Sequence, residues 1–189
     1  ASHSPQNSPT DSKENSSQSH SLTPPHPIES GLKFEWYSRE YLSVGKNGKQ
    51  ISTIRDDCAW LLSYLNIKCN DGIHIFSIKA HECEHGYDAI GIITVKDKSL
   101  ICGKHFPDSK LGYQYYYHPS QHSWSRGETI TVLIDCMSSR IVFKKNGILV
   151  QQNDIEKNKT YYPVLQTCGC SGHRYEILEY KAIRSSISK

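Results

Sequence analysis

The stretch that decides the fold is Trp124-Ser125-Arg126-Gly127-Glu128-Thr129-Ile130-Thr131-Val132-Leu133-Ile134-Asp135. Its aliphatic residues Ile130, Val132 and Ile134 stand at every second position, which is the period of a strand with one buried face. Another apolar run follows at 141–143, and Asn146-Gly147 then supplies the two positive-φ positions of a type I′ turn. The stretch and its continuation therefore predict successive antiparallel strands.

The same pattern continues on both sides of this stretch. Asn47-Gly48 lies in a turn, 46–49, between two short runs with strand character. Residues 73–80 alternate as a half-buried strand, whereas 89–94 form a continuous apolar run typical of a strand buried on both faces. Further strands are expected at 34–36, 41–44, 50–54, 113–117, 148–150, 161–165 and 175–180. Many short strands separated by Gly or Asn turns predict an all-β, antiparallel sandwich or barrel.

One segment has a helical pattern. Leu61, Tyr64 and Leu65 have the spacing i, i+3, i+4, which is the spacing of one face of a helix. We therefore expect a helix of one or two turns within residues 57–66.

The first thirty residues differ in composition from the rest of the 189-residue chain. They hold nine Ser and five of the eight Pro, whereas all Trp, Tyr and Phe residues lie further on. Such a stretch buries too little apolar surface to offset the entropy of ordering it. We expect residues 1–31 to be a disordered tail or linker, 32–182 to be the folded domain and 183–189 to be a C-terminal tail.

Charge, hydropathy and cysteine usage exclude several classes of protein. No run approaches 18 consecutive apolar residues, so we expect no membrane span. The net charge is only +3, with basic and acidic residues interspersed, which argues against a nucleic-acid binder. Seven cysteines at irregular spacings are atypical of a disulfide scaffold and indicate reduced thiols, hence a cytoplasmic or nuclear location.

The deciding stretch resembles a signature of the SPRY domain, the module related to the PRY-SPRY region of tripartite-motif proteins. It is followed at the family's spacing by Ile141-Val142-Phe143-Lys144-Lys145-Asn146-Gly147, and then by Tyr161-Tyr162-Pro163-Val164. Upstream, Gly72-Ile73-His74-Ile75-Phe76-Ser77-Ile78 and Ala89-Ile90-Gly91-Ile92 are similar to two further motifs of the family. The departures are Phe76 where the family has Trp, Glu128 where it has Asp, and an insertion around 168–173.

The resemblance implies a two-sheet antiparallel sandwich of the concanavalin A-like jelly-roll type. It also implies a non-catalytic role, in which loops at one end bind a short peptide or a protein surface. Loops suit this role because strands hold them in place while their sequences stay free to vary. We expect the chain to be part of a larger multidomain protein and the isolated domain to be a monomer, with no cofactor and with no nucleic acid or membrane as partner.

By their order along the chain, the candidate binding loops are 45–49, 96–111 and 167–174. Tyr113, Tyr115 and Tyr117 share one face of their strand and are expected in the core. Tyr116 and His118 would then point the other way, beside a polar loop, as in many recognition surfaces. The candidate partner-binding residues are Lys46, Asn47, Lys49, Asp97, Tyr116, His118, Cys168, Ser171 and His173.

Metal and catalytic motifs are weaker. His81-Glu82-Cys83-Glu84-His85 matches the zinc-protease pattern H-E-x-x-H, but that chemistry needs a helix and these residues read as a polar loop. A structural zinc site could instead use His81, Cys83 and His85, Cys102 and His105, or Cys168, Cys170 and His173. Without zinc, Cys58, Cys102 and Cys136 are expected in the core and the other cysteines on the surface.

Two further interpretations follow from single features. His74 shares a strand face with Phe76 and Ile78, so a core role is favoured over a catalytic one. A carbohydrate-binding lectin is the alternative function, because Tyr and Trp faces stack on sugars. The sequence shows no clustered Asp and Asn of the kind that hold calcium beside a sugar. A zinc-stabilised structural domain is the third hypothesis.

Overall fold

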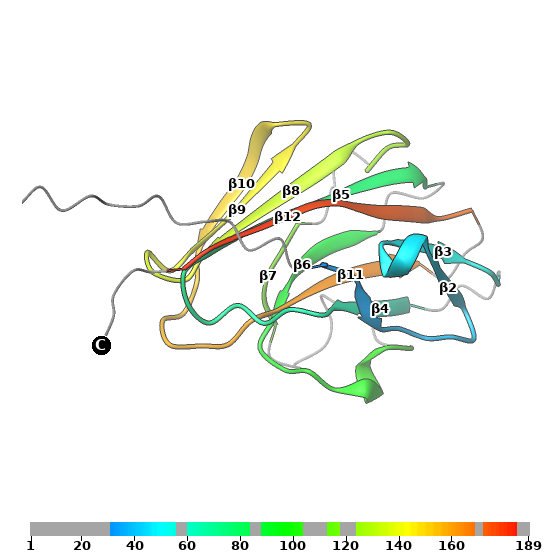
Figure 1. Ribbon diagram of the computed structural model, residues 1–189, viewed down its shortest axis with the longest axis horizontal. Coiled ribbons are helices and arrows are strands. Elements are labelled where there is room, and N and C mark those ends of the chain that lie inside the picture. The colour runs from blue at the N-terminus through cyan, green and yellow to red at the C-terminus, as the bar shows by residue number, and fades with distance from the viewer. Residues whose placement is uncertain are drawn as a thin grey trace, which may run out of the picture.

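Two antiparallel sheets stack face to face in the computed structural model, which describes residues 31–55, 60–83, 88–103, 113–117 (backbone only), 124–168 and 172–184 (Figure 1). The five-stranded sheet has the order β1-β4-β11-β6-β7. Its strands are β1 (Phe34–Trp36), β4 (Trp60–Leu65), β6 (Ala89–Ile93), β7 (Tyr113–Tyr117) and β11 (Tyr162–Cys168). Of the expected tails, 1–31 and 183–189, residues 1–30 and 185–189 lie outside the described residues.

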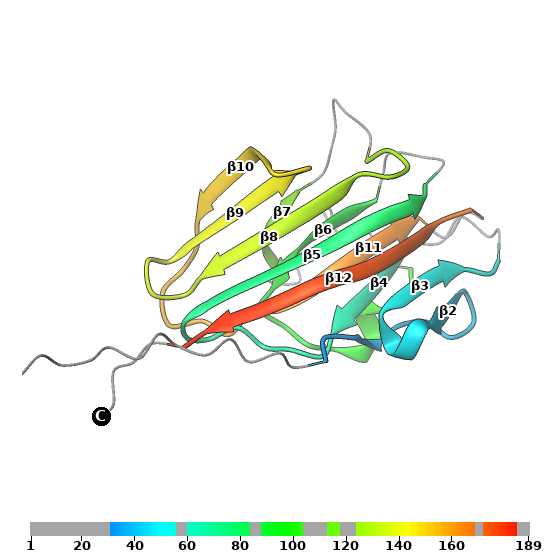
Figure 2. The same cartoon turned by 45° about the horizontal axis from the view of Figure 1, so that its top comes forward.

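The seven-stranded sheet is seen along its whole width in Figure 2, in the order β10-β9-β8-β5-β12-β3-β2. Its strands are β2 (Leu42–Gly45), β3 (Gln50–Thr53), β5 (Ile73–Glu82), β8 (Thr129–Asp135), β9 (Arg140–Lys145), β10 (Ile148–Asp154) and β12 (Arg174–Ile183). Among the described strands neither sheet closes on itself, so the architecture is the expected sandwich and the barrel alternative is wrong.

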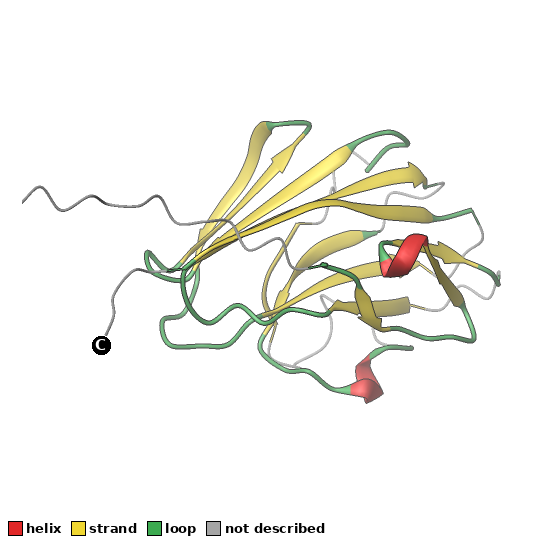
Figure 3. Cartoon of the chain, viewed as in Figure 1, coloured by secondary structure: helices red, strands yellow, loops and turns green. Residues whose placement is uncertain are grey.

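Helical structure is confined, in the described ranges, to two single 3-10 turns, η1 (Lys46–Gly48) and η2 (Lys98–Leu100) (Figure 3). Neither turn, nor any other part of those ranges, offers a helix long and apolar enough to cross a membrane.

The core lies between the sheets and follows the period-two pattern. Strand β8 alternates between partly exposed and fully buried residues, and Ile130, Val132 and Ile134 are the buried set, as expected. Strand β6 is buried at all five positions, also as expected. Strand β6 lies inside the five-stranded sheet, between β11 and β7, and both of its faces are covered.

The hairpin turns depend on left-handed residues. Asn146 and Gly147 have φ values of 49° and 83°, which confirms the type I′ turn between β9 and β10. The Asn146 side chain also accepts a hydrogen bond from the Thr129 N–H at 2.9 Å. The turn between β2 and β3 is longer than a two-residue turn, because Lys46, Asn47 and Gly48 all have positive φ and close a 3-10 turn.

Trp124, the first residue of the deciding stretch, has a structural role. Its side chain is fully buried, its indole N–H donates to the Glu128 carbonyl at 3.3 Å, and its ring centroid lies 4.9 Å from that of Tyr175. Gly127, at φ 88°, makes the turn that leads into β8. The deciding stretch thus begins with a large side chain in the core and continues as a core strand.

The helix expected within 57–66 is wrong, because Trp60–Leu65 is strand β4. This strand lies between β1 and β11, and five of its six residues are buried. The outward-facing Tyr64 is covered by a second small cluster that includes Leu100 and Trp36. Because both faces of the strand are buried, its apolar residues do not alternate, and the resulting pattern resembles that of a helix.

The expected division of the cysteines is partly wrong. Cys69 and Cys168 were expected on the surface, but their exposed fractions are 0% and 9%. Cys69 lies against the core, where its backbone pairs with Tyr161. Cys102 and Cys136 pack against the core as expected, Cys83 is partly buried, and Cys58 and Cys170 lie outside the described residues.

Strand β10 forms one edge of the seven-stranded sheet and begins with exposed aliphatic residues. Ile148, Leu149 and Val150 have exposed fractions of 71%, 56% and 42%. The pairing of β10 with β9 shifts register between Leu149 and Gln151, so Val150 is an extra, bulged residue.

His74 is a core histidine, as expected. It is 8% exposed, and its Nε2 lies 2.9 Å from the Asp71 carbonyl, so Nε2 carries the proton. Its Nδ1 then accepts from the Tyr180 hydroxyl, also at 2.9 Å. Burial lowers the pKa of His74 below its ordinary value of 6.5, although the bond to the Asp71 carbonyl opposes this.

The first prediction concerns pH. Because the pKa of His74 is lower in the folded state, its contribution to stability is complete above about pH 6.5 and is lost as the pH falls below that value. We expect His74→Gln to reduce the loss in free energy of unfolding between about pH 7.5 and about pH 5.5. Urea denaturation of both proteins at the two pH values measures this difference, and identical losses would contradict it.

The second prediction concerns Gly72, which has φ +66°. A Cβ there would lie 2.2 Å from the Ile183 carbonyl oxygen, whereas a Cβ on Gly103, at φ +78°, would meet nothing within 4 Å. Gly103→Ala should therefore cost only the left-handed backbone penalty of about 1 kcal/mol. Gly72→Ala should cost clearly more, because the end of β12 must also move. Equal shifts in the two urea midpoints would show that the overlap has no energetic effect.

Candidate functional site

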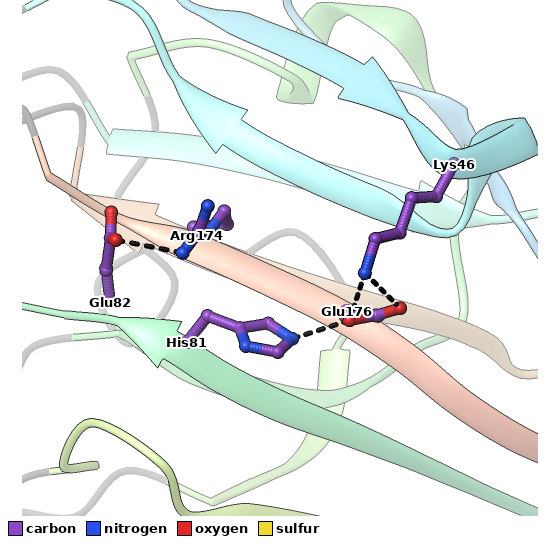
Figure 4. Close-up of polar contacts among 5 residues, drawn as sticks. All are labelled: Lys46, His81, Glu82, Arg174 and Glu176. Carbon is purple, nitrogen blue, oxygen red and sulfur yellow. Dashed lines mark hydrogen bonds and ion pairs between the residues drawn. The ribbon is translucent and has the colours of Figure 1, made fainter.

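Charged side chains gather on the outer face of the seven-stranded sheet, where β5 ends and β12 begins (Figure 4). The Lys46 ammonium donates to both carboxylate oxygens of Glu176, at 2.9 and 3.0 Å. The His81 Nε2 lies 2.5 Å from the same carboxylate. Beside them, the Arg174 guanidinium donates to Glu82 at 2.9 Å. We call these five residues the β5–β12 patch.

A β-bulge builds this patch. Arg174 pairs with Glu82 and Tyr175 pairs with Ala80, so His81 is the extra residue opposite β12. A bulge changes the direction of side chains on the strand that carries it, and here it brings His81 to Glu176. The expectation that 81–85 is a loop is therefore wrong for His81 and Glu82, which end strand β5. The zinc-protease motif needs a helix at these positions, so the strand does not form that site.

The charged groups of the patch pair with one another and are at least partly exposed. The hydrogen bond from Lys46 lowers the pKa of Glu176 below its ordinary value of 4.5; burial opposes this, and the His81 hydrogen bond adds to the lowering. The Lys46 side chain is 56% exposed and that of Arg174 is 40% exposed. Ion pairs at such exposure contribute about 0–1 kcal/mol each to stability. The fold does not depend on them, and they are available to a partner.

Beneath the patch lies a buried carboxylate, Asp88. One oxygen accepts the Cys168 N–H at 2.7 Å, and the other accepts from the His173 Nδ1–H and the Tyr175 hydroxyl. Both Asp88 and the His173 side chain have exposed fractions of 0%. The three donors satisfy a charge that would otherwise be costly to bury. They also join the start of β6, the end of β11 and the start of β12.

Cys83 and Tyr175 complete this buried network. The Cys83 thiol donates to the Trp124 carbonyl, and burial raises the pKa of both Cys83 and Tyr175 above their ordinary values. Both groups are therefore protonated near neutral pH, and a protonated thiol is a poor nucleophile. The network is suited to holding strands in place more than to covalent chemistry.

The structure separates the sequence-predicted contact residues into groups. Lys46, Asn47 and Lys49 are exposed in the turn between β2 and β3, as a contact role requires. Asp97 is also exposed, but it caps η2 by accepting the Ser99 N–H at 2.8 Å, on the outer side of the five-stranded sheet. The structure therefore does not bring Asp97 together with the β2–β3 turn.

The other predicted contact residues are buried or lie outside the description. The expectation that Cys168 and His173 are accessible is wrong, because their exposed fractions are 9% and 2%. Cys168 is the last residue of β11, and His173 is held by Asp88. Tyr116 pairs with Gly91 in β7, where only the backbone is described, and His118 and Ser171 lie outside the described residues.

Sequence reasoning did not single out Asp88, Arg174 or Glu176, although Arg174 is the last residue of the expected binding loop 167–174. Asp88 had a detectable signal, since a carboxylate that directly precedes a fully buried strand must find hydrogen-bond donors. The pairing of Glu176 with Lys46 spans 130 positions and depends on strand register, which no local pattern reveals.

The proposed zinc ligands are only partly described. His85, His105 and Cys170 lie outside the described residues. Among the residues that the structure does describe, no three His, Cys, Asp or Glu side chains are placed to hold a metal ion. The zinc hypothesis stays a prediction that elemental analysis can test.

Comparison with known proteins supports the fold. No protein-family model and no curated protein matches the sequence. The TRIM65 PSpry domain is similar in structure, with a TM-score of 0.57 and 10% sequence identity over 79% of this chain and 91% of that one. The NEUZ (NHR) domain of Neuralized from Drosophila melanogaster has a TM-score of 0.60 and 9% identity over 78% of this chain and 91% of that one. The chain therefore has the SPRY-type sandwich that its motifs indicated.

The third prediction tests the buried carboxylate. Asp88→Asn keeps the shape of the side chain but places an amide donor among the donors of His173 and Tyr175. We expect the free energy of unfolding to fall by about 2 kcal/mol or more, because each buried hydrogen-bond donor left without its acceptor costs about 1–3 kcal/mol. Urea denaturation followed by tryptophan fluorescence measures the loss.

The control for that measurement is Glu156→Gln. Glu156 pairs with Lys159 at 3.6 Å on the surface, and its loss should cost about 1 kcal/mol at most. If Asp88→Asn were no more destabilising than this control, the Asp88 network would not be holding the strands together.

Proposed function

We propose that this chain is a non-catalytic interaction module that binds a short peptide or the surface of another protein. The binding surface is the end of the sandwich where β5 ends and β12 begins. One observation carries the proposal, namely the Asp88 network beneath this end. It fixes the strands on which the neighbouring loops are mounted, and a surface held in place before binding loses less entropy when a partner arrives.

The contact surface in this proposal combines the β5–β12 patch with the turn that carries Lys46, Asn47 and Lys49. Its charges are of both signs, so it suits a partner that offers polar and charged groups of both signs. Tyr116, His118 and Ser171 are added on the sequence argument alone. Asp97 is not part of this surface.

The fourth prediction is a capture experiment with residues 1–189. The triple variant Lys46→Ala, Lys49→Ala, Arg174→Ala should lose a partner that the unchanged chain retains from cell lysate. The control triple variant Lys68→Ala, Lys157→Ala, Lys159→Ala removes the same charge from exposed residues at the opposite end of the sandwich and should retain it. Affinities measured with the purified partner should differ by about tenfold or more between the two variants.

Other outcomes of the experiment would contradict the proposal. Equal retention by both variants would place the binding surface elsewhere. If no protein is captured but a glycan array gives a calcium-dependent signal, the carbohydrate-binding alternative would replace it. A further variant, Tyr116→Ala with His118→Ala and Ser171→Ala, shows whether the three residues chosen from the sequence take part.

A further inference from the structure

A groove of about 590 Å³ lies on the other side of the molecule, against the five-stranded sheet. One wall is the segment 35–40, which includes the end of β1, and the other is formed by Lys98 of η2 and by Ile101. Figure 1 shows η2 as the short green coil beneath β4, on the side of β4 that faces away from the seven-stranded sheet. The groove is therefore separate from the β5–β12 patch.

Two lysine ammonium groups lie near the ring of Trp36 at this groove. The Trp36 ring and that of Tyr64 pack in a T-shaped arrangement, with centroids 5.8 Å apart and planes at 70°. The ammonium groups of Lys96 and Lys98 lie 4.5 and 5.3 Å from the centroid of the Trp36 ring. The negative face of an indole ring attracts cations at such distances, so one aromatic side chain holds two of them.

The two carboxylates that line the groove already form ion pairs within the chain. Glu35 pairs with Lys96, and Glu40 pairs with Arg55. Lys98 and Arg39 line the groove, both are exposed, and neither has a carboxylate partner within the described part of the chain. Two positive charges thus remain beside the partly exposed apolar surface of Trp36, Tyr37 and Ile101.

We propose that this groove is a second recognition site and that it binds a peptide segment with acidic side chains next to an apolar one. The acidic groups pair with Lys98 and Arg39, and the apolar side chain packs on the Tyr37 and Ile101 side of the groove. Charge complementarity selects this occupant over a basic or neutral peptide. The site goes beyond the proposed function, because it uses the opposite sheet and none of the residues of the β5–β12 patch.

The test begins with a random peptide library displayed on phage and selected on the full chain. Selection is repeated on the variant Arg39→Glu with Lys98→Glu, and on a control, Lys157→Glu with Lys159→Glu, which changes the net charge by the same amount. We expect acidic peptides with an apolar residue to be enriched on the unchanged chain and on the control, but not on the groove variant. Binding of the synthesised peptides should weaken about tenfold or more in the groove variant only.

A second measurement locates the binding. The three tryptophans give three indole N–H signals in NMR spectra, and a Trp36→Phe variant assigns that of Trp36. Peptide binding should shift the Trp36 signal and leave that of the fully buried Trp124 in place. The variant Lys46→Ala, Lys49→Ala, Arg174→Ala should bind these peptides unchanged, so this result is independent of the proposed function.

Five outcomes would overturn the proposal. Enrichment of peptides without acidic residues, or no enrichment at all, would show that the groove does not select an acidic peptide. Equal weakening by the groove and control variants would show a general effect of charge. An unshifted Trp36 signal, or loss of binding in the Lys46, Lys49 and Arg174 variant, would place the peptides elsewhere.

Discussion

Burial of the Asp88 carboxylate is the constraint on which one end of this sandwich depends. A charge with no exposure to water requires hydrogen-bond donors, and here they come from the last residue of β11 and from residues at the start of β12. Strands β6 and β11 belong to one sheet and β12 to the other. A single polar side chain therefore joins the two sheets at a position where apolar packing alone would fix them less specifically.

The surface above this network follows from the same arrangement. Because Asp88 holds His173 and Tyr175 from below, the bulge opposite them has a defined position and places His81 next to Glu176. The outer side of the patch is thus polar and accessible. Beneath it, both carboxylate oxygens of Asp88 accept hydrogen bonds. This combination of an adaptable surface on a fixed support is what recognition by strand-mounted loops requires.

Much of the fold could be predicted from the sequence, because many of its strands and turns are determined by residues that lie close together in the chain. The alternation of Ile130, Val132 and Ile134 and the Asn146-Gly147 turn both define structure within a few residues, and both expectations are confirmed. The expected helix within 57–66 is instead strand β4, because burial on both faces removes the alternation of apolar and polar residues that marks a strand. Cys168 and His173 were also misplaced, because their small and polar neighbours indicated an exposed loop tip. Asp88, 80 or more positions away, holds them in the interior.

The edge strand β10 has a consequence for how these molecules coexist in solution. Its first three residues expose aliphatic side chains at a free edge, which is the kind of strand on which other chains add. The bulge at Val150 interrupts the straight row of backbone groups immediately after those residues, and the polar residues Gln151 to Asp154 follow. An incoming strand would therefore find only a short matching segment at this edge before the row of backbone groups is interrupted.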